Sequence, residues 1–383
     1  MKIAFEAQLF LKGEKTGIAW CADNIIKELA VRESCRCNYF SLGYKKGQLC
    51  KVEKYEKYGV QGCKCRWFHD ILYKLIWPFI PIPYSWFFRE KADITLFFNC
   101  VVPPGVSGKS VVIVHDMAYK VCPETVRLKT KRWLQLTLKR SCRRADAIVT
   151  VSDSSKRDII QYLGIEPEKI SVMPNGVDLR YFHNNYERGA IENLKKKYRI
   201  EDEYFLYLGT LEPRKNIPFL LRAYKRLTED KLNVKIPQMV LAGGKGWLYD
   251  SIFSTVKELC LEDYVLFTGY LEEDEVPLVM CGAKAFVFPS KYEGFGMPPL
   301  EAMACGTPVI TSDTSSLPEV VGDAGLLVNP ESVEDIYLAM KEIMMNDELS
   351  ETLSRKGLER ARLYTWESSA KILYGLYGRL LEI

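Results

Sequence analysis

The chain has 383 residues, 48% of them apolar, and this length usually exceeds what one hydrophobic core can fill, so we expect two domains. Its 53 basic and 49 acidic residues leave a formal charge of +4, which excludes the overall polycationic character that favours nucleic acid. Twelve cysteines are scattered along it and no apolar segment of signal-peptide length follows Met1, so we expect reduced thiols and a cytosolic protein.

Short runs of β-branched and aromatic residues alternate with amphipathic stretches, a pattern typical of parallel sheets joined by helices. In the first half of the chain we expect strands at residues 3–5, 94–98, 111–114, 147–151 and 170–172. In the second half we expect them at residues 204–208, 239–242, 265–267, 285–288, 309–310 and 326–328. The two similar sets predict an α/β protein with two Rossmann-like units.

Turn-forming residues at Pro174 to Asp178 separate the two sets of strands. We therefore expect an N-terminal domain at residues 1–180, a C-terminal domain at 181–363 and a last helix at 364–383. Ligands of open parallel sheets bind outside the carboxyl ends of the strands, so we expect the site in a cleft between the domains. The residues just after strands are the candidates for its chemistry.

The segment Glu293 to Glu301 follows one such strand and opens a helix, with two glycines and two prolines between its carboxylates. Glycines let a ligand approach the backbone, and exposed N–H groups at a helix start can hold hydroxyl or phosphate oxygens. Either the glutamates bind a ligand, or Glu301 complements the helix N-terminus while Glu293 is solvated.

The segment Gly209 to Asn216 follows another strand and presents Arg214 beside Lys215. Arginine can hold phosphate oxygens with two hydrogen bonds, and lysine adds a charge that stabilises a departing diphosphate. The alternative is an ordinary solvated pair of cations.

His115 comes directly after the strand at 111–114, where it could donate a hydrogen bond to a sugar or phosphate; it could instead be a satisfied structural histidine. Near the start of the chain, Gly13 and Gly17 could bring backbone to a phosphate or acceptor, although their spacing is not a dinucleotide fingerprint. The run Gly243 to Gly246 lacks the Ser or Thr of a Walker loop, so we interpret it as a turn.

Together these residues resemble the large retaining glycosyltransferase family 4, which has the GT-B fold and includes bacterial O-antigen and capsule mannosyltransferases. The resemblance runs nearly end to end and rests on Gly17-Ile18, His115-Asp116, Val151-Ser152 with Ser155-Lys156, Pro174 to Asp178, Gly209 to Asn216, and Glu293 to Glu301. It implies two Rossmann-like domains facing across a deep cleft. The N-terminal domain would face the acceptor, the C-terminal domain would hold the donor, and the helix after Tyr364 would cross back to the N-terminal domain.

The resemblance also implies roles for individual residues. It places Glu293 and His115 at the donor sugar, Glu301 at the nucleotide ribose and Lys215 at the phosphates. The residues that it assigns to catalysis are His115, Glu293, Arg214 and Lys215, and those that it assigns to donor binding are Gly17, Gly209, Arg214, Lys215, Glu293, Gly294, Phe295, Gly296 and Glu301. Many members carry arginine where this chain has Thr210, and we expect Arg214 to supply that charge.

The family mechanism implies same-face attack with the leaving diphosphate helping to deprotonate the acceptor, so we expect no divalent metal or other cofactor. The cysteine pairs Cys35/Cys37 and Cys63/Cys65 lack zinc spacing, and the acidic run Glu272 to Glu275 is interpreted as a helix cap. The expected donor is GDP-mannose, with a UDP-sugar as the alternative, and the expected acceptor is a glycan or lipid-linked saccharide. A sugar-binding protein without catalysis and a nucleotide-sugar epimerase are the rival classes.

Residues 66–90 are rich in aromatic side chains, but their prolines interrupt any spanning helix. With Lys129, Arg132, Lys139 and Arg143, the segment could rest on the inner membrane surface and meet a lipid-linked acceptor. The alternative is a set of packed aromatics beside a solvated helix face.

Overall fold

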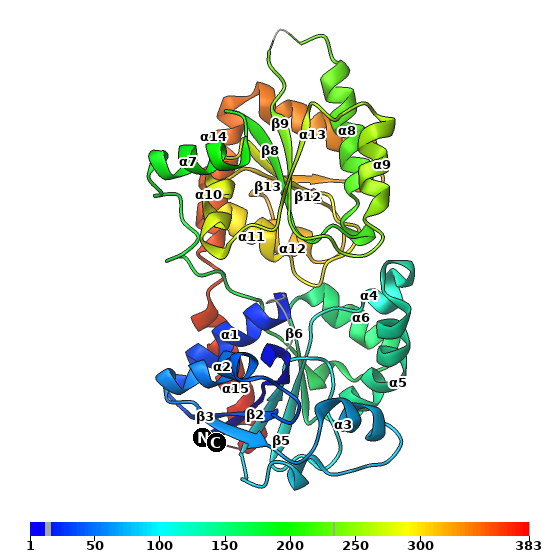
Figure 1. The fold of residues 1–383 in the computed structure, drawn as a ribbon, viewed down its shortest axis with the longest axis vertical. Coiled ribbons are helices and arrows are strands. Elements are labelled where there is room, and N and C mark those ends of the chain that lie inside the picture. Colours follow the sequence, from blue (N-terminus) through cyan, green and yellow to red (C-terminus); the bar gives the residue numbers. More distant parts are fainter. Residues whose placement is uncertain (12–16, 233, 383) are drawn as a thin grey trace. The chain divides into compact units, whose positions relative to one another are not determined.

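The computed structural model describes residues 1–11, 17–232 and 234–382, and the chain divides into two compact units (Figure 1). Unit 1 consists of Met1–Lys120, Leu128–Gly176 and Trp366–Ile383, and unit 2 consists of Val121–Arg127 and Val177–Thr365. The boundary between the units lies after Gly176, whereas we expected it after residue 180 from the sequence.

Unit 1 is built on a seven-stranded parallel sheet in the order β3-β2-β1-β4-β5-β6-β7. Its strands are β1 (Lys2–Glu6), β2 (Ser34–Phe40), β3 (Gln61–Cys65), β4 (Ile94–Phe97), β5 (Lys109–Val114), β6 (Ala147–Thr150) and β7 (Ile170–Val172). Its α-helices are α1 (Gly17–Ala30), α2 (Lys46–Glu53), α3 (Asp70–Ile76), α4 (Ala118–Val121), α5 (Leu128–Arg144), α6 (Asp153–Leu163) and α15 (Trp366–Leu381). Short 3-10 turns are η1 (Gln8–Leu11), η2 (Lys54–Tyr58), η3 (Tyr84–Trp86), η4 (Pro123–Thr125) and η5 (Pro167–Lys169).

Unit 2 is built on a six-stranded parallel sheet in the order β10-β9-β8-β11-β12-β13. Its strands are β8 (Tyr204–Leu208), β9 (Gln238–Ala242), β10 (Val265–Gly269), β11 (Ala285–Phe288), β12 (Val309–Ser312) and β13 (Gly325–Val328). Its α-helices are α7 (Arg188–Tyr198), α8 (Ile217–Glu229), α9 (Asp250–Glu258), α10 (Val276–Cys281), α11 (Met297–Ala304), α12 (Leu317–Val321), α13 (Val333–Met345) and α14 (Asp347–Ala361). Its 3-10 turns are η6 (Pro213–Lys215) and η7 (Glu273–Glu275).

The central strands are mostly apolar and fully buried, because helices cover both faces of each sheet. Every residue of β4, β6, β11 and β12 is buried. All eleven predicted strands are present, with ends that move by no more than two residues, and the expected fold of two Rossmann-like units is confirmed.

The sequence analysis missed β2 and β3. These neighbouring strands carry the two close cysteine pairs, and their parallel register sets Cys37 beside Gly62 and Asn38 beside Cys63. Neither strand has the β-branched composition that marks the other strands, because β2 reads SCRCNYF and β3 reads QGCKC. All twelve cysteines are free thiols, as the sequence predicted.

The order of the strands reverses once in each sheet. In unit 1 the chain moves outward from β1 to β3 and then returns to the other side of β1 with β4, and in unit 2 the same reversal places β11 beside β8. The carboxyl ends of the strands at such a reversal are the usual ligand position of an open α/β sheet. The site should therefore be sought after β1 and β4, and after β8 and β11.

The last helix, α15, belongs to unit 1, where it packs against α1. Ser369 Oγ donates to the carbonyl of Pro174 at 2.6 Å, and Tyr374 Oη donates to the carbonyl of Leu29 at 3.4 Å. The predicted return of the C-terminal helix to the N-terminal domain is thus confirmed. Within the described parts of the chain, every helix is too short or too polar to span a bilayer.

Candidate functional site

The candidate site in unit 2 lies where β8 and β11 end side by side. The turn η6 follows β8 and carries Arg214 and Lys215, and the loop after β11 carries Glu293. Because these two strands pair directly, residues that are 78 or 79 positions apart in the sequence come into contact. The structure therefore brings together three of the four residues predicted to take part in catalysis, at the reversal of the sheet.

Glu293 is at the centre of a buried network and is only 8% exposed. Its Oε1 accepts a hydrogen bond from Lys215 Nζ at 2.6 Å and another from Ser290 Oγ at 2.6 Å. Its Oε2 accepts from Arg214 Nη1 at 3.0 Å. The alternative in which Glu293 is solvated is excluded.

Arg214 joins this network to a second carboxylate. Its Nε and Nη2 lie 3.2 and 2.9 Å from Glu212 Oε1, and its Nη1 also donates to the carbonyl of Tyr292 at 2.9 Å. The cluster of Glu212, Arg214, Lys215 and Glu293 holds two cations and two anions. We call it the charge cluster, and the alternative in which Arg214 and Lys215 are an ordinary solvated pair is also excluded.

The protonation of the charge cluster can be derived from its geometry. Burial alone would raise the pKa of Glu293, but the charges of Arg214 and Lys215 and the hydrogen bonds from Lys215 and Ser290 outweigh it and lower this pKa to about 2. Burial lowers the pKa of Lys215, and the charge of Glu293 opposes that change. Glu293 is therefore a carboxylate at neutral pH, and it is the anion that keeps Lys215 charged.

Two serines after β12 fix the loop that contains Glu293. Ser315 Oγ accepts from the N–H of Glu293 at 2.9 Å, and Ser316 Oγ lies within hydrogen-bond distance of two carbonyls, those of Glu293 at 2.9 Å and Phe295 at 2.7 Å. Gly296 has a φ of +118°, which a side chain would disfavour, and it is the N-cap residue of α11. In the described part of the chain the N–H groups of Phe295 and Gly296 donate to no other group, so they are available to an oxygen-rich ligand.

Glu301 lies one turn further along α11 and is not part of the charge cluster. Among the described residues its carboxylate makes no hydrogen bond or ion pair, and burial raises its pKa to about 7. A carboxylate in this state gains stability from any ligand that donates hydrogen bonds to it, as the two hydroxyls of a ribose would.

The turn after β8 is packed tightly against the turn after β9. A Cβ added to Gly243 would lie 2.1 Å from the carbonyl oxygen of Gly209, and the N–H of Leu211 donates to the carbonyl of Gly244 at 3.0 Å. A Cβ at Gly246 would lie 2.8 Å from Thr210 Cγ2. The run Gly243 to Gly246 bends at Gly243 and then pairs with the turn after β8, through an isolated β-bridge between Lys245 and Leu211. It therefore packs against backbone, with no room for a side chain at Gly243 or Gly246.

In unit 1, His115 follows β5 next to the reversal of that sheet. Its Nε2 lies 3.0 Å from the carbonyl oxygen of Phe98, so Nε2 carries the proton and donates to that oxygen. Burial lowers the pKa of His115, which leaves the ring neutral with Nδ1 as an acceptor. The expected hydrogen-bond donor toward a ligand is thus corrected: the N–H is already used, and only Nδ1 can serve a ligand.

Gly17 begins α1, and a side chain at this position would meet open space, so neither crowding nor backbone conformation requires a glycine here. Gly13 lies outside the described residues. Among the residues that are described, no three His, Cys, Asp or Glu side chains are placed to hold a metal ion. The acidic run forms the turn η7, where Glu272 and Glu275 make a capping box, and Glu275 also binds Lys197 and Tyr198. The expected cap of the following helix is thus corrected, because the cap is at η7 and Glu275, the N-cap residue of α10, makes no side-chain cap hydrogen bond there.

Sequence reasoning missed several polar residues that shape the site, namely Glu212, Ser290, Ser315 and Ser316. Each follows a strand of the second sheet, which was the signal available in the sequence. Their partners depend on which strands are neighbours, and that information is absent from the local pattern.

Comparisons with known proteins agree with this arrangement. The family model described as "Glycosyl transferases group 1" matches residues 190–360, and the model described as "Glycosyltransferase Family 4" matches residues 16–181. The chain is 34% identical over 287 residues to the O-antigen chain mannosyltransferase B of Escherichia coli, covering 74% of each chain. It is 32% identical over 240 residues to the serotype-specific mannosyltransferase WbdA of Escherichia coli, covering 62% of this chain and 29% of that protein.

Among solved structures, the sucrose-phosphate synthase of Thermosynechococcus elongatus superposes with a TM-score of 0.76 at 19% identity, covering 100% of this chain and 99% of that one. This likeness concerns the fold. Two Rossmann-like units with a charge cluster at a strand-order reversal define a glycosyltransferase of the GT-B class. The chain belongs to glycosyltransferase family 4 and is a sugar-transferring enzyme.

Proposed function

We propose that this enzyme transfers mannose from GDP-mannose, with retention of anomeric configuration, to a glycan or lipid-linked saccharide during the synthesis of a bacterial surface polysaccharide. The mannosyltransferases named among its relatives support the choice of sugar and pathway. The observation that carries the proposal is the charge cluster, in which the buried Lys215 and the half-buried Arg214 contact the carboxylate that the family resemblance assigns to the donor sugar.

The proposed reaction exchanges one bond at the anomeric carbon. The bond from that carbon to the β-phosphate oxygen of the donor breaks, a bond to the acceptor oxygen forms on the same face, and the acceptor proton passes to the departing diphosphate. Arg214 and Lys215 stabilise the negative charge that grows on the diphosphate. The N–H groups of Phe295 and Gly296 and the carboxylate of Glu293 position the donor.

Donor binding in this proposal requires the charge cluster to change its pairing. The four side chains are balanced in charge, so a diphosphate that approaches Lys215 and Arg214 competes with Glu212 and Glu293 for the same donors. Glu293 can then turn toward hydroxyls of the sugar. A site that is neutral before the donor arrives avoids the cost of leaving the buried Lys215 and the half-buried Arg214 unpaired.

The remaining parts of the proposal concern the ribose, the neutral histidine and the location. Glu301 accepts hydrogen bonds from the ribose hydroxyls, and His115 accepts one from a sugar hydroxyl through Nδ1. The chemistry needs no divalent metal or other cofactor, because the cations are side chains. The enzyme acts in the cytoplasm, peripherally at the inner membrane face, where a lipid-linked acceptor is presented.

A transfer assay tests the proposal. The enzyme is incubated with GDP-mannose, UDP-glucose or UDP-galactose, a lipid-linked or soluble mannoside acceptor and an excess of EDTA, and the product is examined by proton NMR. We expect transfer from GDP-mannose and an α-linked product, the configuration of the donor. Transfer only from a UDP-sugar would show that GDP-mannose is not the donor. Release of free sugar at a rate that does not depend on the acceptor would contradict the proposed transferase function.

A further inference from the structure

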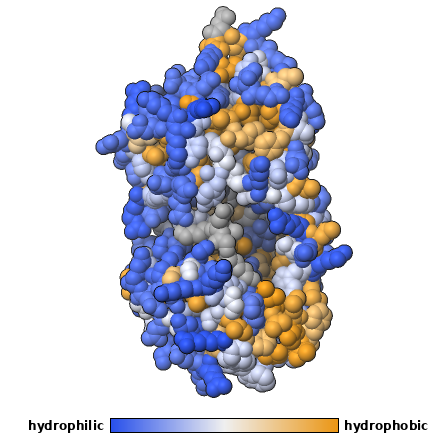
Figure 2. Space-filling view, viewed as in Figure 1, coloured by the Kyte–Doolittle hydropathy of each residue, from blue (hydrophilic) through white to orange (hydrophobic). Residues whose placement is uncertain are grey.

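The surface of unit 1 carries an apolar patch on and around α3. Its side chains are more than half exposed: Trp67 at 62%, Ile71 at 51%, Leu72 at 51%, Leu75 at 59%, Phe79 at 74%, Ile80 at 58% and Trp86 at 63%. Figure 2 shows hydrophobic surface, drawn in orange, on the part of unit 1 where Figure 1 labels α3. Large contiguous apolar patches are uncommon on proteins that meet only water, so this one calls for a partner.

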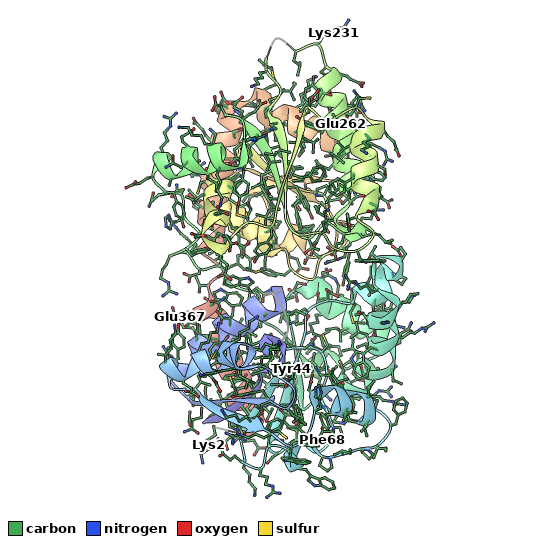
Figure 3. The ribbon with its side chains drawn as sticks, in the orientation of Figure 1. Lys2, Tyr44, Phe68, Lys231, Glu262 and Glu367 are labelled. Atoms are coloured by element: carbon green, nitrogen blue, oxygen red, sulfur yellow. The ribbon has the colours of Figure 1, made fainter. Side chains whose placement is uncertain are left out.

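The patch is not needed to complete the core, because other aromatic residues of the same segment already do so. Tyr73 stacks edge-on against Phe87 with ring centroids 4.8 Å apart and lies 5.4 Å from Phe40 of β2. Phe68 lies 5.1 Å from the same Phe87, and the label in Figure 3 marks its place in the segment. The expected role of the aromatics at the membrane is thus corrected in part: most of them pack inward, and the outward face is largely aliphatic.

The neighbouring helix α5 gives the patch its charge. Arg140 Nη1 donates to the carbonyl of Pro78 at 3.2 Å, and Trp77 and Trp133 pack edge to face at 6.3 Å, so α5 runs beside the end of the patch. Seven of the 17 residues of α5 are Lys or Arg and none is Asp or Glu. Within the described chain none of these seven side chains makes an ion pair, which leaves the helix face free to attract an anionic partner.

We infer that the α3 patch and the basic face of α5 together form a docking surface for an anionic phospholipid bilayer. This inference rests on the proposed function in one respect, since a lipid-linked acceptor places the reaction at a bilayer. The aliphatic side chains enter the boundary between headgroups and acyl chains, Trp67 and Trp86 lie at the headgroup level, and the lysines and arginines of α5 contact lipid phosphates.

A second copy of the chain is a poorer occupant of this surface. A two-fold dimer brings the same patch of both subunits together, so the unpaired cations of one α5 would approach those of the other. A lipid surface offers apolar depth and negative charge at once, which matches both halves of the docking surface.

Sedimentation of the full chain with vesicles tests the inference. One vesicle set is phosphatidylcholine alone and the other contains phosphatidylglycerol in addition. We expect binding only to the anionic set, weakened by high salt. The double variant Leu72→Ser/Leu75→Ser should lower the partition coefficient about tenfold or more, and Lys129→Ala/Lys139→Ala should lower it about fivefold for each charge removed.

Matched controls change similar residues elsewhere in unit 1. Val31→Ser removes an apolar side chain that is 78% exposed, and Lys46→Ala/Lys51→Ala removes two lysines of α2, and neither change should alter vesicle binding. Thermal unfolding confirms that each variant is folded. Equal loss in the controls, or binding that ignores lipid charge, would overturn the inference, as would a dimer in sedimentation velocity that the Leu72/Leu75 variant dissociates.

The vesicle assay and the transfer assay fail independently. Anionic vesicle binding by a protein that transfers no sugar would leave the docking surface standing and contradict the proposed function. Transfer to a soluble acceptor by a protein that does not bind vesicles would support the proposed function and contradict the docking surface.

Discussion

The two sheets of this enzyme share a topology and differ in the loops at the carboxyl ends of their strands. At the reversal in unit 2, the loops after β8 and β11 hold the charge cluster, whose four ionised side chains neutralise one another. In unit 1, His115 follows β5, one strand beyond the reversal, and it is neutral and hydrogen-bonded to backbone. The same scaffold thus carries paired charges in unit 2 and a neutral hydrogen-bond acceptor in unit 1.

The largest expected effect comes from removing the cation that Glu293 keeps charged. We expect Lys215→Met to lower the transfer rate about a thousandfold, because one stabilising group of the departing diphosphate is lost in a buried site. Steady-state kinetics with GDP-mannose measure this effect. Lys257→Met on α9 is the control and should be silent, and a Lys215 variant with normal kcat would show that unit 2 does not use its charges as described.

Replacing the carboxylate of Glu293 separates its role in transfer from its pairing with Arg214 and Lys215. We expect Glu293→Gln to lower transfer about a hundredfold while affinity for GDP is kept or rises, because Arg214 and Lys215 are released from their partner. The buried Lys215 then lacks its anion while Arg214 keeps Glu212, so the free energy of unfolding should fall by about 3 kcal/mol. Calorimetric titration with GDP and thermal unfolding check both, and a parallel loss of GDP affinity would contradict the competition within the charge cluster.

The pH dependence of nucleotide binding should track the ionisation of Glu301. Because burial raises its pKa to about 7, the carboxyl is protonated below that pH and accepts ribose hydrogen bonds poorly. We expect GDP affinity to fall as the pH drops through 7, with proton release on binding near that pH. Titrations in buffers of different ionisation enthalpy measure the release, which Glu301→Gln should abolish and the exposed Glu262→Gln should keep.

The same group affects the stability of the ligand-free enzyme with a definite sign. The folded pKa of Glu301 lies above its ordinary value of 4.5, so the folded state binds more protons between pH 4.5 and 7 and loses stability as the pH rises through that window. We expect Glu301→Gln to raise the unfolding free energy at pH 8 by roughly 1 kcal/mol, after allowance for screening at a partly exposed residue, and to have little effect at pH 4.5. Chemical denaturation at both values checks this, and an effect of the same size at both would contradict the assignment.

The smallest expected effect on the transfer rate is in unit 1. Glutamine can replace the Nε2 hydrogen bond to Phe98 but offers no acceptor in the place of Nδ1, so His115→Gln should keep the melting temperature and lower transfer about tenfold. The pH profile of activity should keep its shape in this variant, because the histidine stays neutral and contributes no inflection of its own. Full activity in this variant would show that His115 is a structural residue. The contrast between the charge cluster of unit 2 and a neutral ligand-binding group in unit 1 would then be wrong.

Sequence reasoning went furthest where local composition marks structure. The strands before Arg214, Glu293 and His115 were predicted because buried parallel strands are continuously apolar. Edge strand β3 and its neighbour β2 were missed because charged and cysteine residues fill them. Even the family resemblance did not show that Glu293 holds both cations, since that contact depends on the pairing of β8 with β11 and on side-chain burial.

For the docking surface too, the sequence did not show which side chains face outward. The sequence suggested aromatic contacts for residues 66–90, but only the fold shows that Tyr73 and Phe87 pack inward while Leu72 and Leu75 face outward. A helix of seven residues is too short for its apolar face to be recognised from periodicity alone.

Calorimetric titration of GDP and GDP-mannose into the enzyme and its Lys215→Met variant, both in EDTA, tests the central claim most directly. We expect metal-independent binding of both nucleotides by the unaltered enzyme and binding at least about tenfold weaker by the variant, since a charged hydrogen bond to phosphate is lost. Equal affinity in the two proteins, or no nucleotide binding by the folded enzyme, would show that the charge cluster is not the diphosphate site.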